Sequence, residues 1–75
     1  MRISELKEGN IVRLNHFGQT ALSYRRRLLS FGLTKGTVVK IIRFAPLGCP
    51  VQLEVRGATI TLRKEEADSL HWELV

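Results

Sequence analysis

The chain has 75 residues, which is enough for one domain over residues 1–75. A domain of this size has a small core, so its stability is expected to be marginal. A single cysteine excludes an internal disulfide. The sequence contains no apolar window of ~18 residues and no signal peptide, so we expect a cytoplasmic protein that is not membrane-embedded. The net charge of +5 permits nucleic acid, an anionic membrane or an acidic protein as partner, although this charge is also ordinary for a small soluble domain.

The first residues predict a helical turn followed by a strand. Ser4 is the expected cap and Gly9 the expected stop of one short turn. A strand is then expected over residues 10–14, in which Val12 and Leu14 share one face. Residues 16–19 connect this strand to the next element.

A helix is predicted over about residues 21–30, with Thr20 as its N-cap. At about 100° per residue, its apolar side chains fill an arc of about 180°. The arc holds Ala21, Leu22, Tyr24, Leu28, Leu29 and Phe31. A surface helix usually buries a stripe of ~100°, so one flank of the arc is expected to lack cover from the chain itself. The alternative is that loops cover the excess and Arg25 lays its aliphatic stem along it.

The segment after this helix predicts a turn and the central strand of the fold. Gly32 is expected to end the helix, and Gly36 to take a positive φ in the turn that follows. Residues 37–44 are rich in β-branched types and carry apolar side chains on both faces. We therefore expect the sheet to wrap around this strand.

The rest of the chain predicts a proline-bounded loop, a hairpin, a helical turn and a last strand. After the loop, these elements are expected over residues 51–55, 59–62, 64–68 and 70–75. Arg56 to Ala58 make the hairpin reversal, and the last strand places Leu70, Trp72 and Leu74 on one face.

About five short strands in such a short chain predict a mainly β fold. We expect a small SH3-like barrel with one helix and one or two short helical turns, because closure removes strand edges. A five-stranded OB-type barrel is the competitor, but it would normally need longer strands.

The sequence contains no combination of residues that predicts catalysis or a cofactor. No local signature links a serine or the cysteine to a histidine, and no glycine-rich phosphate loop is present. His16, Cys49 and His71 are single residues far apart, so no metal site is expected; the alternative is that they converge in space. Cys49 is interpreted as a small apolar filler.

A nucleic-acid-binding small barrel is the alternative from a different class. The phosphate contacts would come from Arg25, Arg26, Arg27, Lys35, Lys40, Arg43 and Arg56. Single-strand binders also need exposed aromatic side chains for base stacking. Because most aromatic residues here have inward phases, nucleic acid is not the expected partner.

Several motifs together are typical of one family. They are the basic helix ending in Leu28-Leu29, its glycine stop, the loop Ala45-Pro46-Leu47-Gly48-Cys49-Pro50, and Leu62-Arg63-Lys64 followed by Ala67. In these motifs the chain resembles the FeoA family, ferrous iron transport protein A of bacteria. It departs from the family at Cys49, where aspartate is common, and at Lys35, where proline is frequent.

The resemblance implies a cytoplasmic SH3-like module that contacts FeoB, a membrane transporter for ferrous iron with a cytoplasmic GTP-binding domain. The implied role is to support or regulate iron uptake. The same barrel resembles the C-terminal domain of iron-dependent repressors of the DtxR type. A metal-responsive regulatory module therefore stays an alternative.

The uncovered helix flank and the nearby loop together predict a surface that binds FeoB. The predicted partner-binding residues are Leu22, Tyr24, Arg25, Arg26, Arg27 and Leu28 on the helix, and Pro46, Leu47, Gly48 and Pro50 in the loop. Apolar residues would supply the contact, and the arginines would steer and anchor on acidic groups. In the alternatives, the leucines are core, or one arginine acts on the GTPase as an arginine finger. Such a surface also allows weak self-association.

Overall fold

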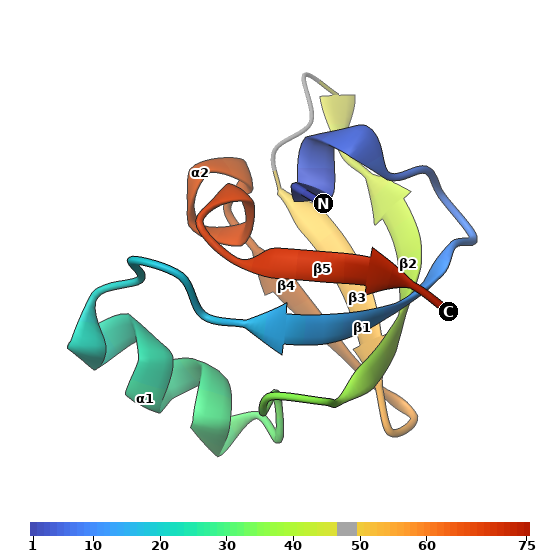
Figure 1. Cartoon of the computed structure of the whole chain (residues 1–75). Helices are drawn as coiled ribbons and strands as arrows, with labels where there is room; N and C mark the ends of the chain where they lie inside the picture. Colours follow the sequence, from blue (N-terminus) through green and yellow to red (C-terminus); the bar gives the residue numbers. More distant parts are fainter. Residues whose placement is uncertain (47–49) are drawn as a thin grey trace.

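The computed structural model describes residues 1–46 and 50–75, in which five antiparallel strands form one sheet in the order β4-β3-β2-β1-β5. The strands are β1 (Ile11–His16), β2 (Val38–Phe44), β3 (Val51–Val55), β4 (Ala58–Leu62) and β5 (His71–Leu74). The remaining elements are the 3-10 helix η1 (Ile3–Glu5) and the helices α1 (Leu22–Ser30) and α2 (Lys64–Asp68). The sheet folds over on itself, with β3 and β4 behind β1 and β5 (Figure 1). The predicted mainly β, SH3-like architecture is confirmed.

β2 occupies the central place that the sequence predicted, since it pairs with β1 on one side and with β3 on the other. Val39 and Ile41 point into the core and are almost fully buried, whereas Val38 on the opposite face is 44% exposed. The core therefore covers the face of β2 that carries Val39 and Ile41, and part of the opposite face is open to solvent.

The predicted β3–β4 hairpin is confirmed. The two strands pair from Val51 opposite Leu62 to Val55 opposite Ala58. Arg56 and Gly57 both have positive φ values, 51° and 83°, in the reversal between them. Two successive positive φ values are typical of a type I′ turn, whose twist matches that of the flanking strands.

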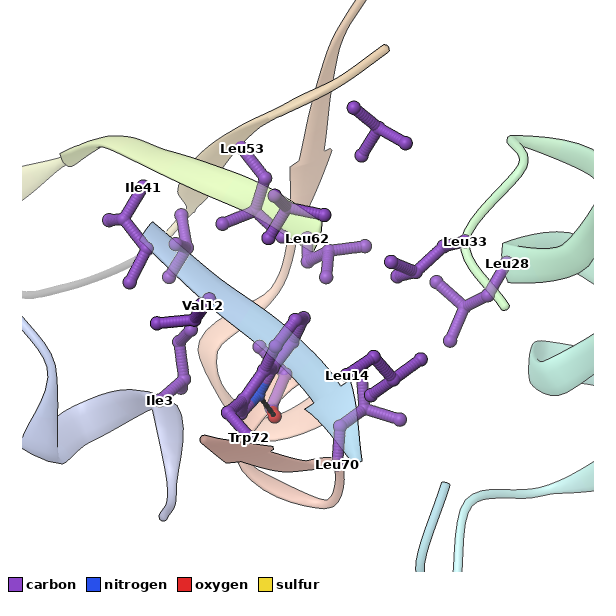
Figure 2. Packing of buried hydrophobic residues seen from close by; sticks show 14 of the residues in the cluster. Ile3, Val12, Leu14, Leu28, Leu33, Ile41, Leu53, Leu62, Leu70 and Trp72 are labelled. Carbon is purple, nitrogen blue, oxygen red and sulfur yellow. Dashed lines mark hydrogen bonds between the residues drawn. The ribbon is translucent and has the colours of Figure 1, made fainter. Parts of the chain in front are cut away.

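A single apolar cluster fills the sheet and joins it to the helices (Figure 2). Trp72 lies within it, and its indole Nε1 donates to the Ala67 carbonyl at 3.3 Å, which fixes α2 against β5. Of the three residues that the sequence placed on one face of the last strand, Leu70 and Trp72 are buried and Leu74 is not. Leu74 is 53% exposed, because it is the last residue of β5 and no described element covers that end.

Three boundaries near the N-terminus differ from the prediction: the start of η1, the start of β1, which is Ile11 rather than residue 10, and the end of β1. η1 begins at Ile3 rather than Ser4, because Ile3 is fully buried and the Arg2 backbone N–H donates to the Glu5 carboxylate at 2.8 Å. β1 continues to His16, which the sequence placed in a connection. An irregularity in register between Leu14 and His16 sets His16 opposite a residue of β5.

α1 begins one residue later than predicted, and Thr20 is not its N-cap. Ala21 takes that position without a side-chain bond. The Thr20 hydroxyl instead bonds to the Phe17 carbonyl and lies 3.0 Å from the Ser69 hydroxyl, which ties the connection to the residue after α2. No helix in the described part of the chain combines the length and hydropathy needed to cross a bilayer.

The predicted glycine stop of α1 is confirmed and anchors the helix. Gly32 has a φ of 84°, and its N–H donates to the Leu29 carbonyl at 2.9 Å while the Leu33 N–H donates to the Leu28 carbonyl at 3.0 Å. This pattern is a Schellman motif, which brings the residues at its two ends into apolar contact. Leu28 and Leu33 are fully buried and point from the α1 side into the core (Figure 2).

Candidate functional site

The end of α1 that carries Leu28 is anchored in the core, and this orientation leaves one flank of the helix open. Leu22 and Leu29, seven residues apart on that flank, are 61% and 46% exposed. Arg25 and Arg26 each lie three or four positions from both leucines and are exposed. We call Leu22, Arg25, Arg26 and Leu29 the α1 outer flank.

The two arginines of the α1 outer flank differ in how they are held. The Arg25 guanidinium carbon lies 4.9 Å from the centroid of the buried Phe17 ring, a cation–π contact that orients the side chain. Arg25 thus lies over an apolar residue, as predicted by the alternative in which loops and Arg25 cover the helix. Leu22, however, stays exposed. Neither Arg25 nor Arg26 forms an ion pair with a carboxylate in the described ranges 1–46 and 50–75.

The prediction that Leu28 supplies apolar contact to a partner is wrong. Leu28 is fully buried and belongs to the core cluster. The Schellman motif turns this side chain toward the sheet, as the alternative predicted for the leucines. Leu29, which the sequence placed in the apolar arc but not among the partner-binding residues, takes the exposed position instead.

The opposite flank of α1 borders a cleft of about 480 Å³. Tyr24 and Arg27, three residues apart, lie on this side of the helix. The cleft, which we call the α1–β4 cleft, is lined by Tyr24, Arg27, Pro50, Thr61, Leu62, Arg63 and Glu66. The sequence did not predict roles for Arg63 and Glu66, although Arg63 belongs to the Leu-Arg-Lys segment that carries the family resemblance.

The hydroxyl of Tyr24 is buried and has no hydrogen-bond partner among the residues that the structure describes. Burial and, to a smaller extent, the Glu66 carboxylate raise the pKa of Tyr24 to about 12, while the Arg27 guanidinium opposes the shift. The phenol therefore stays protonated over the whole physiological range. It presents a donor that has no acceptor within residues 1–46 and 50–75.

Titration of Tyr24 is expected to show this environment directly. It is the single tyrosine of the chain, so phenolate absorbance should report it alone, with a midpoint of about 12 in the folded protein against about 10 in denaturant. Because the unfolded chain loses this proton first, the free energy of unfolding should fall as the pH rises from about 10 to about 12. A folded midpoint near 10 would contradict the buried placement.

The structure describes only part of the loop from Ala45 to Pro50. Pro46 is exposed, and Pro50 lines the α1–β4 cleft. Leu47 and Gly48, two of the predicted partner-binding residues, lie outside the described residues together with Cys49. Their part in the predicted surface stays a prediction.

Two of the three residues in the metal-site alternative, His16 and His71, lie together, and the third, Cys49, lies outside the described residues. His16 and His71 stack across β1 and β5 with ring centroids 4.1 Å apart. The Gly18 N–H donates to His16 Nδ1 at 3.2 Å. Within residues 1–46 and 50–75, no group of three or more histidine, cysteine, aspartate or glutamate residues is arranged to hold a metal ion.

The aromatic side chains bear on the nucleic-acid alternative. Phe17 and Trp72 are buried, while Tyr24 and Phe44 are partly buried against the core. Phe31 is the one aromatic residue classed as exposed, at 41%. All five lie in the described ranges, so they do not form the row of exposed rings on which successive bases stack.

Comparison with known proteins places this structure among relatives. The family model described as "FeoA domain" matches residues 1–74. The whole chain is 33% identical to part of the Fe(2+) transport protein A/Fe(2+) transporter FeoB fusion protein of Porphyromonas gingivalis, of which it spans 9%. A solution structure of a FeoA protein from Chlorobium tepidum matches all of this chain and 70% of that one, with 35% identity and a TM-score of 0.92.

The fold also occurs in a protein of a different kind. The manganese regulator SloR matches the whole chain with a TM-score of 0.85 over 34% of its own length. Its sequence identity is 11%, so this likeness shows the fold alone.

Proposed function

The chain belongs to the FeoA domain family, and from this premise we propose that it is a cytoplasmic accessory protein of ferrous iron uptake that binds FeoB. The contact is made by the α1 outer flank and needs no catalysis by this chain. Membership of the family links the chain to ferrous iron transport. The contact with FeoB and its location are the proposal.

One observation carries the proposed contact. In the Porphyromonas gingivalis fusion, a segment related to this whole chain is part of the same polypeptide as FeoB. Covalent linkage raises the effective concentration of one module near the other, which favours a weak contact between them. A separate chain of the same family is proposed to make that contact in trans.

The α1 outer flank has the composition of a small contact surface. Leu22 and Leu29 supply exposed apolar area at its centre. Arg25 and Arg26 border them with positive charge that no described carboxylate neutralises. Apolar anchors contribute most to affinity, while bordering charges mainly increase the association rate toward an acidic surface.

Titration against the cytoplasmic part of FeoB tests the proposal. We expect saturable binding by calorimetry, weakened but not abolished by added salt, since exposed charges are screened and apolar contact is not. The titration is repeated without nucleotide, with GDP and with a GTP analogue, and GTP hydrolysis is followed in parallel. Absence of saturable binding under all three conditions would overturn the proposal. Tight binding of single-stranded DNA instead would favour the nucleic-acid alternative.

A further inference from the structure

The α1–β4 cleft is lined by two arginines whose guanidinium hydrogen-bond donors are largely unused among the described residues. Arg63 Nε lies 4.0 Å from a Glu66 carboxylate oxygen, at the outer limit of an ion pair, and the Arg63 side chain is 79% exposed. Such a pair contributes little and does not occupy the other donors of the guanidinium. The Arg27 guanidinium lies 5.8 Å from the Phe31 ring centroid and pairs with no carboxylate in the described residues.

The third unused donor is the Tyr24 hydroxyl. It is buried, it belongs to a residue that lines the cleft, and it has no acceptor in the described part of the chain. A buried polar group without a partner costs free energy, so native structures usually satisfy such groups. An acceptor brought in by a ligand would satisfy this hydroxyl.

The charges that line the cleft select among anions. Arg27 and Arg63 contribute two positive charges and Glu66 one negative charge, which leaves a net charge of +1. A single carboxylate matches this charge, and its planar pair of oxygens fits the fork of a guanidinium. A phosphate dianion would be repelled more strongly by the Glu66 carboxylate but also attracted more strongly by the two arginines, so inorganic phosphate is the competing anion to test.

We propose that the α1–β4 cleft receives one aspartate or glutamate side chain of the partner protein, held by Arg27, Arg63 and the Tyr24 hydroxyl. This inference rests on the proposed function for the identity of the partner, FeoB. It adds a second, polar contact on the side of α1 opposite the α1 outer flank. Together the two contacts place α1 between FeoB surfaces of different chemistry.

Variants of the donors test the cleft within the complex. Arg63→Gln is expected to weaken binding of the cytoplasmic part of FeoB about tenfold, and Tyr24→Phe about threefold, because each removes a donor to the carboxylate. Tyr24→Phe removes a hydroxyl that is buried without a partner, so the variant should unfold at the temperature of the wild type or above it. Arg43→Gln is the matched control, since Arg43 is exposed on β2 and does not line the cleft. If Arg63→Gln and Tyr24→Phe bind like the wild type, the cleft inference is overturned while the proposed function stands.

A second measurement tests carboxylate binding by the cleft without FeoB, so it applies even if FeoB does not bind this chain. The side-chain Nε–Hε NMR signals of Arg27 and Arg63 are followed in the intact chain during titration with N-acetylglutamate α-amide. N-acetylglutamine α-amide is the neutral control, and inorganic phosphate is the competing anion. Shifts of both signals with the glutamate probe alone support the site. No shift, equal shifts with the neutral probe, or larger shifts with phosphate would each overturn the assignment.

Discussion

Leu28→Ala is expected to lower the free energy of unfolding by about 3 kcal/mol, because it removes a fully buried side chain and leaves a cavity. In a domain of this size that loss corresponds to a decrease in Tm of roughly 12–24 °C. Leu28 also takes part in the Schellman motif with Leu33, so its side chain joins the end of α1 to the core. Urea or thermal unfolding followed by circular dichroism measures the change.

The same substitution at Leu22 is the matched control. Leu22 lies on the same helix but is 61% exposed, so Leu22→Ala should change the free energy of unfolding by no more than about 0.5 kcal/mol. If Leu28→Ala proved as stable as Leu22→Ala, Leu28 would not anchor the helix. The predicted contact between Leu28 and a partner would then need to be tested again.

Helical periodicity alone does not distinguish the buried Leu28 from the exposed Leu22. Leu22 and Leu28 both fall in the apolar arc of about 180°, and a helix wheel does not say which part of that arc faces the sheet. The orientation of α1 depends on how the chain leaves the helix. The glycine stop at Gly32 was predicted from the sequence, but the contact of Leu33 with the core, which rotates Leu28 inward, depends on packing.

The strands were predictable to within a few residues because they follow local rules. Alternation over Val51–Val55 and a glycine in the reversal determine the β3–β4 hairpin, and no distant residue is needed to specify it. The errors lie at element ends, where burial of single residues decides. Ile3 is an example, since its full burial moves η1 toward the N-terminus.

The α1–β4 cleft was not predictable, because its residues meet only in the folded chain. Tyr24 and Arg27 come from α1, whereas Arg63 and Glu66 lie at the start of α2. In the sequence, Glu66 stands next to Glu65 and two residues before Asp68, and the three arginines 25–27 are consecutive. The structure separates these arginines, with Arg25 and Arg26 on one flank and Arg27 on the other.

Leu22→Asp is expected to weaken binding of the cytoplasmic part of FeoB about 30-fold, or about 2 kcal/mol, if the α1 outer flank is the contact surface. The substitution places a charged group where the partner would bury apolar area. Leu22 is the first residue of α1, and a carboxylate there interacts favourably with the helix N-terminus, so the fold should be retained. Calorimetric titration measures the affinity, and thermal unfolding of the variant checks the fold.

Ser23→Asp separates loss of apolar contact from the effect of the added charge. Ser23 is exposed in the same helical turn but lies about 100° further round the helix, away from Leu22 and Leu29. Both variants lower the net charge by one and place the new carboxylate in the first turn. Loss of binding in Leu22→Asp alone assigns the contact to the apolar centre of the α1 outer flank. Equal losses would show that the charge of the helix attracts the partner, and wild-type binding by Leu22→Asp would move the contact to another face of the molecule.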